Sequence, residues 1–135
     1  MRIVLDANVI IAAYATRGLC QAILELCLDQ HDLFVSPELI NEIRKNLLKK
    51  IRLPEALAQE IVHFIESKSV MVEPDVHDPS TCRDPHDVFI LGIATAAQAD
   101  LVVTGDQDLL VLRRFRGIPI LSPSSFARLL RGSGK

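Results

Sequence analysis

The chain has 135 residues, with 15 Lys and Arg against 17 Asp and Glu, and its formal net charge is −2. Hydrophobic residues make up 49% and charged residues 24%, a composition that excludes an intrinsically disordered chain. The balanced charge also excludes a generally basic nucleic-acid-binding surface, so any polyanion must meet a local basic cluster.

No segment is predicted to cross a membrane. The longest uninterrupted apolar run, residues 9–15, has seven residues, whereas a membrane-spanning helix needs about 20. Asp6 and Asn8 interrupt the apolar stretch near the N-terminus that would be needed for an export signal. We therefore expect a cytoplasmic protein, and its odd number of cysteines, three, fits reduced thiols in the core.

The first half of the chain alternates strand and helix patterns. In chain order we expect a strand at 2–5, helices at 8–15 and 20–28, a strand at 33–35, a helix after Ser36-Pro37, a helix at 55–65 and a strand at 69–72. Ser36 and Pro37 are residue types typical of the N-cap and first position of a helix.

A turn-rich segment with three prolines, residues 74–86, precedes the second half. There we expect a helix at 88–99, a strand at 101–103, a short helix from 107, a strand at 118–121 and a helix opened by Ser122-Pro123. Short strands that are apolar on both faces and alternate with helices predict a parallel sheet covered on each side. The expected fold is α/β, a three-layer α/β/α sandwich with a short, mainly parallel central sheet. We expect one domain over residues 1–131 and a frayed tail over 132–135.

Four acidic residues are expected at one edge of this sheet. Asp6 and Asp106 follow the carboxyl ends of predicted strands, where open α/β sheets bind ligands. Asp87 and Glu42 lie near the starts of helices that begin at the same edge. Each acid also has a structural interpretation: Asp6, Asp106 and Asp84 as helix caps, Asp87 as a first-turn acid and Glu42 as a solvated helix residue.

Convergence of these carboxylates would raise their pKa values and oppose folding, unless a divalent cation neutralised them. An all-oxygen ligand set favours Mg²⁺ or Mn²⁺ over zinc, and we expect His77 and His86 in the preceding loop not to be ligands. One or two such ions suit hydrolysis of a phosphodiester bond. The chain contains no nucleophile motif and no Gly-rich phosphate loop.

Two basic clusters are candidates for contact with phosphate, although a solvated helix face explains such clusters equally well. The first contains Arg44, Lys45, Lys49, Lys50 and Arg52, and the second contains Arg113, Arg114 and Arg116. We select Arg44, Lys45, Arg113 and Arg114 as the candidate contacts to the phosphates of a nucleic acid. Base stacking would use Tyr14, Phe115 or arginine planes, although core packing is the expected role of both rings.

Four segments in order resemble the PIN domain family, and in particular its VapC-like toxins of bacterial and archaeal toxin–antitoxin pairs. The matching segments are residues 3–10 (IVLDANVI), 36–43 (SPELINEI), 83–87 (RDPHD) with 90–94, and 102–110 (VVTGDQDLL). None is specific alone, but four in this order are specific, and the resemblance covers nearly the whole chain.

The resemblance implies a metal-dependent ribonuclease in which four carboxylates hold Mg²⁺ or Mn²⁺ and activate water. The matching residues are Asp6, Glu42, Asp87 and Asp106 as ligands, Asn8 and Thr104 as polar supports that orient them, and Asp84 and Asp108 as outer ligands or helix caps. Single-stranded RNA as substrate, a cognate antitoxin and a homodimer are further implications.

Three alternatives to a toxin nuclease remain at this point. The first is a catalytically silent PIN scaffold that binds RNA or a protein, the second is a PIN nuclease of RNA processing or decay, and the third is a phosphoacceptor receiver domain. A receiver domain shares the fold class and the aspartate after the first strand. It needs a lysine beside the phosphate, and the segment 118–120 offers none.

Overall fold

A computed structural model describes residues 1–82, 84 and 87–133 of the chain. In chain order the elements are β1 (Arg2–Leu5), α1 (Ala7–Ala15), α2 (Leu19–Gln30), β2 (Asp32–Val35), α3 (Pro37–Lys49), α4 (Glu55–Lys68), β3 (Val70–Met71), η1 (Pro79–Thr81), α5 (Val88–Ala96), β4 (Leu101–Val103), α6 (Gln107–Leu110), β5 (Arg114–Phe115), β6 (Ile118–Leu121) and α7 (Pro123–Ser133).

The strands form one sheet in the order β3-β2-β1-β4-β6-β5. Every neighbouring pair is parallel except β5 and β6, which form an antiparallel hairpin. Ile3 on β1 stands opposite both Leu33 on β2 and Leu101 on β4. The predicted mainly parallel sheet is confirmed, and β1 and β4 are paired side by side at its centre.

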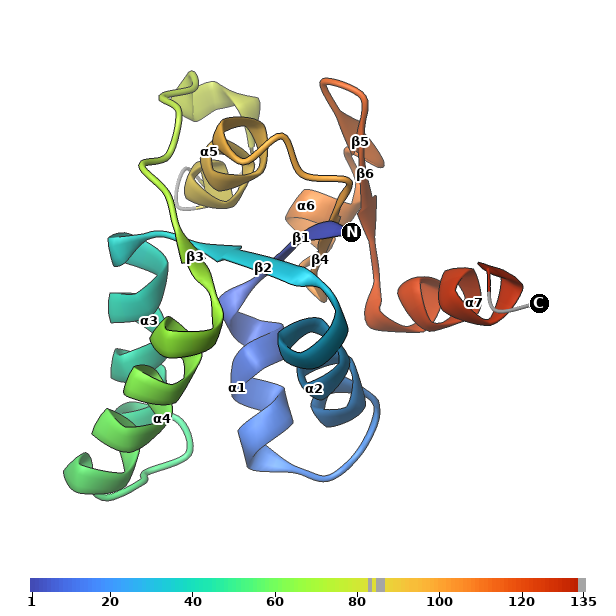
Figure 1. The fold of residues 1–135 in the computed structure, drawn as a ribbon. Helices are drawn as coiled ribbons and strands as arrows, with labels where there is room; N and C mark the ends of the chain where they lie inside the picture. Colours follow the sequence, from blue (N-terminus) through green and yellow to red (C-terminus); the bar gives the residue numbers. More distant parts are fainter. Residues whose placement is uncertain (83, 85–86, 134–135) are drawn as a thin grey trace.

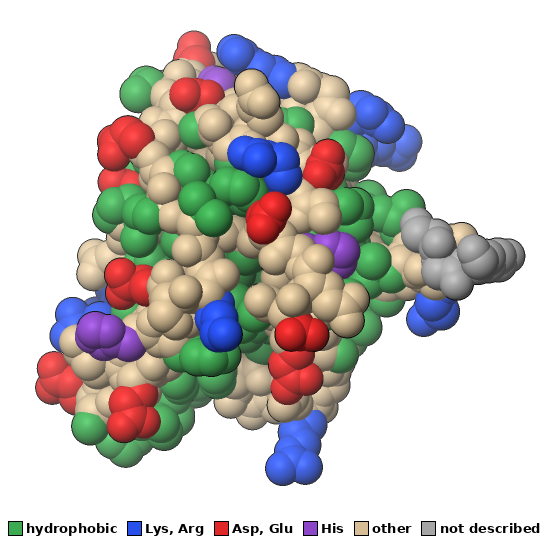
Figure 2. Space-filling view, in the orientation of Figure 1, with side chains coloured by type: hydrophobic (Ala, Val, Ile, Leu, Met, Phe, Trp, Pro, Cys, Tyr) green, Lys and Arg blue, Asp and Glu red, His purple; other side chains and the backbone are tan. Residues whose placement is uncertain are grey.

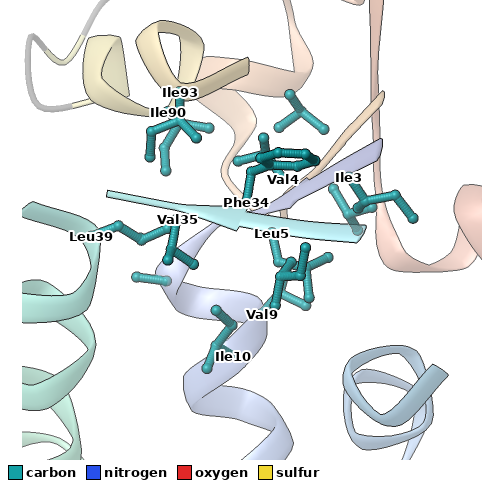
Figure 3. Close-up of a cluster of buried hydrophobic side chains, with 14 of the residues drawn as sticks. Ile3, Val4, Leu5, Val9, Ile10, Phe34, Val35, Leu39, Ile90 and Ile93 are labelled. Atoms are coloured by element: carbon teal, nitrogen blue, oxygen red, sulfur yellow. The ribbon is translucent and has the colours of Figure 1, made fainter. Parts of the chain in front are cut away.

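Helices cover both faces of the sheet. Helix α5 packs on one face, and α1 and α2 lie on the other, with the α3–α4 pair beside them (Figure 1). Figure 3 shows Val4 and Phe34 on the side of the sheet that faces α5, where Ile90 also lies, and Leu5 on the side that faces α1, where Ile10 also lies. All five side chains are buried. The predicted three-layer sandwich is therefore confirmed.

Helix α3 begins where the residue types predict. The Ser36 hydroxyl oxygen accepts a hydrogen bond from the Leu39 N–H at 3.1 Å, and Pro37 takes the first helical position. Leu39, Ile43 and Leu47 form its buried stripe. This start places the first turns of α3 at the carboxyl edge of the sheet, directly after β2.

The segment before α5 is attached to that helix by close packing. The Asp75 N–H donates a hydrogen bond to the Gly92 carbonyl oxygen at 3.0 Å. A Cβ at position 92 would collide with the Asp75 carbonyl oxygen, so only glycine fits here. His77 Nε2 lies 2.9 Å from the Thr95 hydroxyl, and the His77 ring meets the Phe115 ring edge-on at 5.0 Å.

Several element boundaries differ from the prediction. Helices α2 and α4 extend to Gln30 and Lys68, whereas α5 ends at Ala96 and not at 99. The early end of α5 coincides with a left-handed residue, Gln98, whose φ is 51°. Helix α7 runs to Ser133 and so includes two residues of the expected tail, whereas 134 and 135 lie outside the described residues.

Strand β5 was not predicted. It has two residues, and it is enclosed by residues with positive φ: Arg113 at 61°, Arg116 at 50° and Gly117 at 82°. Left-handed arginines give no turn signal in the sequence, because asparagine and glycine are the usual residues in this conformation.

No single helix among the described residues is long and apolar enough to cross a membrane; α1 and α2 together pass by length and composition, with a bend of 114° between them. The three cysteines are free thiols. Cys27 and Cys82 are buried, Cys20 is half-buried, and burial raises the pKa of Cys27 to about 12.

Candidate metal centre

The four predicted acids come to one edge of the sheet. Asp6 directly follows β1, and Asp106 occupies the N-cap position of α6 soon after β4. Because β1 and β4 are parallel neighbours, their carboxyl ends lie side by side. Asp87 is at the N-cap position of α5, and Glu42 lies in α3, which begins directly after β2.

The tightest group of carboxylates contains three aspartates. Asp87, Asp106 and Asp108 each offer one oxygen atom, and these atoms lie within 4.8 Å of one another. Asp87 is buried, and the other two are half-buried. Carboxylate oxygens at this spacing form the donor set that hard divalent cations take. Asp108, expected as an outer ligand or a helix cap, therefore lies in one group with Asp87 and Asp106.

Asp6 is joined to this group through the hydroxyl of Thr104. Thr104 Oγ1 donates a hydrogen bond to Asp6 Oδ2 at 2.7 Å and accepts one from the Asp106 N–H at 3.0 Å. Thr104 is fully buried, and Asp6 is only 6% exposed. A threonine hydroxyl has a single hydrogen and can also accept hydrogen bonds. Its oxygen accepts the Asp106 N–H, and its hydrogen is donated to Asp6.

The pKa of Asp6 is raised, mainly because the carboxylate is buried. The hydrogen bond from Thr104 opposes this change, and the negative charges of Glu42 and Asp106 add to it. Glu42 is half-buried and lies outside the group of three, so its link to the other acids is electrostatic.

Asp87 carries the strongest sign that a cation belongs here. Its pKa is raised to about 7, first by burial, then by hydrogen bonding with Asp106, and further by the charges of Asp106, Asp6 and Asp84. Its Oδ2 atom is buried and has no hydrogen-bond partner among the described residues. Buried unpartnered carboxylate oxygens are rare, and a divalent cation would satisfy this atom and relieve the repulsion. The residues present fit Mg²⁺ or Mn²⁺.

The capping interpretation holds for one acid. Asp106 Oδ1 accepts the Asp108 N–H at 2.9 Å and so caps α6, as expected. For Asp6 the capping prediction is wrong, because its side chain makes no capping hydrogen bond to α1. Asp87 takes the N-cap position of α5, and the Asp84 carbonyl oxygen accepts the Asp87 N–H at 3.0 Å, so a capping role for the Asp84 side chain stays a prediction.

Of the other residues considered in the sequence, some contact the acids and some do not. Asn8 is exposed, and no hydrogen bond joins it to Asp6 or Asp106. His77 is held by Thr95, and His86 lies outside the described residues. The supporting role expected for Asn8 therefore remains a prediction, whereas Thr104 contacts both aspartates.

The four candidate basic residues lie in different parts of the fold. Lys45 lines a hollow together with Glu42, and Arg44 lies 3.5 Å from Glu55 on α4. Arg114 is the first residue of β5 and pairs with Pro119 near the start of β6, and Arg113 directly precedes it. Because β6 is parallel to β4, the start of β6 and Arg114 beside it lie toward the amino edge of the sheet, away from the acids. Acidic and basic side chains are interspersed on the face shown in Figure 2.

Comparison with known proteins identifies the family to which these features correspond. A family profile described as the PIN domain matches residues 2–108. No curated protein matches the chain. Among solved structures, the chain is similar to VapBC2 from Rickettsia felis bound to a DNA fragment from their promoter, with a TM-score of 0.61 and 15% identity. The match covers 90% of this chain and 98% of that chain, and at this identity the likeness concerns the fold.

Proposed function

Because the chain belongs to the PIN domain family, we propose that it is a metal-dependent endoribonuclease that hydrolyses phosphodiester bonds in single-stranded RNA. The observation that carries this proposal is the buried Asp87 carboxylate, which has an oxygen without a partner among the described residues and lies in one group with Asp106 and Asp108 at the edge of the sheet. A divalent cation would satisfy this oxygen and neutralise the neighbouring carboxylates.

We assign Asp6, Glu42, Asp87 and Asp106 as the residues that hold Mg²⁺ or Mn²⁺, with Asp108 beside them. When bound, the cation lowers the pKa of an attacking water and stabilises the charge that develops on the phosphate oxygens. Thr104 keeps Asp6 oriented through its hydroxyl. Asn8 and Asp84 are assigned outer supporting roles. Exposed and half-buried acids open the site to solvent on one side, which is where RNA must approach.

We also propose that the nuclease is the toxin of a toxin–antitoxin pair, with a cognate antitoxin as its protein partner and a homodimer as its assembly. The resemblance to VapC-like toxins supports this, and the similar solved structure is named VapBC2. A nuclease of RNA processing or decay has the same chemistry and is separated only by its effect on growth. A silent scaffold is disfavoured, because such a protein has no need to bury repelling carboxylates.

Cleavage of mixed single-stranded RNAs tests the proposed chemistry. Wild type, Asp6→Asn and the matched control Asp29→Asn, an exposed acid on α2, are incubated with Mg²⁺, with Mn²⁺ and with EDTA. We expect products only from wild type and Asp29→Asn, and only with metal. Equal cleavage by Asp6→Asn, or cleavage in EDTA, would overturn the proposal.

Induced expression in a bacterial host tests the toxin assignment. We expect wild type to arrest growth and Asp6→Asn to permit it. Normal growth with wild type, combined with RNA cleavage by the purified protein, would replace the toxin assignment by the processing alternative.

A further inference from the structure

Two adjoining hollows lie beside the start of α5. Each has a volume of about 310 Å³, near the lower end of the range of roughly 300–1,000 Å³ for small-ligand sites. Glu38 on α3 and Phe89 on α5 line both hollows. The first hollow continues along the segment 73–79 and the second continues between α3 and α5.

The second hollow adjoins the candidate metal centre. Glu42, one of the four proposed metal-holding residues, lines it directly. Asn41, Asn46 and Lys45 contribute amides and a positive charge, and Phe89 contributes a ring that is 41% exposed. A substrate bound at Glu42 therefore lies beside this surface.

We infer that the second hollow, between α3 and α5, is a subsite for one nucleobase of the RNA strand next to the phosphate that is cleaved, with the Phe89 ring as its stacking surface. The inference rests on the proposed function and adds a specificity-determining site to it. Aromatic rings bind single-stranded RNA by stacking on bases, because every base has a π-face.

The charges of the hollow favour a base over a phosphate. Glu38 and Glu42 repel a phosphate inside it, whereas Lys45 can meet a backbone phosphate at the rim. Carboxylate and amide oxygens accept hydrogen bonds from base amino groups. We therefore expect bases that carry an amino group to be preferred over uracil in this position.

The first hollow differs in kind. It is lined by Glu38, Glu73 and Asp75 together with apolar residues, so it repels the RNA backbone and is compatible instead with a basic peptide. The second hollow has the lysine, the amides and the direct connection to Glu42. RNA is therefore the ligand class that the second hollow favours.

A series of short single-stranded RNAs, each with one abasic position, tests the inference by the kcat/KM of cleavage. For wild type, we expect one abasic position beside the cleaved bond to lower kcat/KM about tenfold, equivalent to about 1.4 kcal/mol, the size of one base–aromatic stack. Phe89→Ala should lose about tenfold on intact RNA and nothing further at that abasic position.

Three further variants make the test specific. Phe89→Tyr keeps an aromatic face and should keep the wild-type profile. Phe64→Ala removes a ring on α4 that is 47% exposed and lies outside both hollows, so it should change nothing. If Phe89→Ala fails to fold, Asn41→Ala, an exposed position in the same hollow, should alter the base preference and decides the outcome.

Each failure has a separate reading. RNA cleavage with the same abasic profile in wild type, Phe89→Ala and Asn41→Ala would overturn the base subsite and leave the nuclease standing. Absence of RNA cleavage by wild type would overturn the proposed function, and the base subsite with it.

Discussion

At the residue scale, the proposed metal site makes a proton and a cation compete for Asp87. Its pKa of about 7 means that the metal-free protein keeps this carboxyl group largely protonated below neutral pH. A cation must displace that proton, since carboxylate ligands bind metal in their ionised form. The same burial that raises the pKa thus makes metal binding stronger as pH rises.

The stability of the metal-free protein should depend on pH through Asp87. Its pKa is raised from 3.8 to about 7 in the folded state, so the folded state holds the extra proton between these values. The stability that this group contributes is fully present below about pH 4 and is lost as pH rises through 7. We expect the melting temperature in EDTA to fall between pH 5 and 8.

Asp87→Asn serves as the comparison for this pH dependence. Asparagine removes the titration and the repulsion, so it should flatten the pH profile and raise metal-free stability near pH 8 by on the order of 1–3 kcal/mol. Thermal unfolding with EDTA and with saturating Mn²⁺ measures both effects, and Mn²⁺ should stabilise only wild type. An unchanged pH slope in the variant would contradict the assignment.

Thr104 should matter more for its hydroxyl than for its volume. Thr104→Val keeps the shape but removes the hydrogen bonds to Asp6 and from Asp106. We expect a loss of about 1–3 kcal/mol of stability, because the Asp106 amide loses its partly buried acceptor, together with slower RNA cleavage. Thr104→Ser should retain both properties. Equal behaviour of the valine and serine variants would show that the hydroxyl has no such role.

At the scale of elements, the metal centre depends on how the segment 73–78 packs on α5. Its backbone crosses the helix at Gly92, and His77 is attached to Thr95 one turn further along. These contacts precede η1 and the segment that leads to Asp87. Packing at Gly92 therefore contributes to the position of the acid at the start of α5.

Gly92→Ala should destabilise the protein although alanine is the better helix former. The added Cβ would collide with the Asp75 carbonyl oxygen, and relief requires backbone movement that costs about 1–3 kcal/mol, more than the gain of about 1 kcal/mol in helix propensity. Gly18→Ala is the control, since nothing lies within 4 Å of its added Cβ. Equal denaturation midpoints for the two variants would refute this packing argument.

Regular elements are predictable from the sequence because their side chains repeat with a fixed period. The start of α3 is predicted from Ser36 and Pro37, whose preferences are local. Strand β5 is not predictable in this way, because its position depends on pairing with β6 and on the left-handed backbone conformations of Arg113 and Arg116.

The site was predictable in its location but not in its contacts. Asp6 and Asp106 follow strands, so their shared edge is a consequence of parallel pairing. The sequence does not predict that the Asp108 carboxylate lies close to that of Asp87, because the distance between them depends on how the start of α6 is placed relative to α5. The role proposed for Phe89 has no signal in the sequence, since α5 is almost entirely apolar and predicts a core position for its ring.

At the scale of the whole molecule, the candidate basic residues differ in which edge of the sheet they lie near. Lys45 shares a hollow with Glu42 at the acidic edge, whereas Arg114 lies in β5 beside the start of β6, away from that edge. A strand of RNA bound at the acids should therefore meet the lysine and not the arginine.

Salt-dependent RNA binding tests this division. We expect Lys45→Ala to weaken binding of single-stranded RNA to the Asp6→Asn protein and to reduce the slope of log K against log salt by about 0.7, the value for one phosphate contact in a single strand. Arg114→Ala should leave affinity and slope unchanged. The reverse result would place the RNA path across the β5–β6 turn.

The measurement that tests the central claim most directly is a crystal structure of the wild-type protein with saturating Mn²⁺, recorded with anomalous scattering. The account predicts a manganese peak at the acidic edge, bound by Asp87 and Asp106 and accompanied by Asp6. Absence of a peak there at saturating Mn²⁺, or manganese bound only elsewhere on the chain, would contradict it.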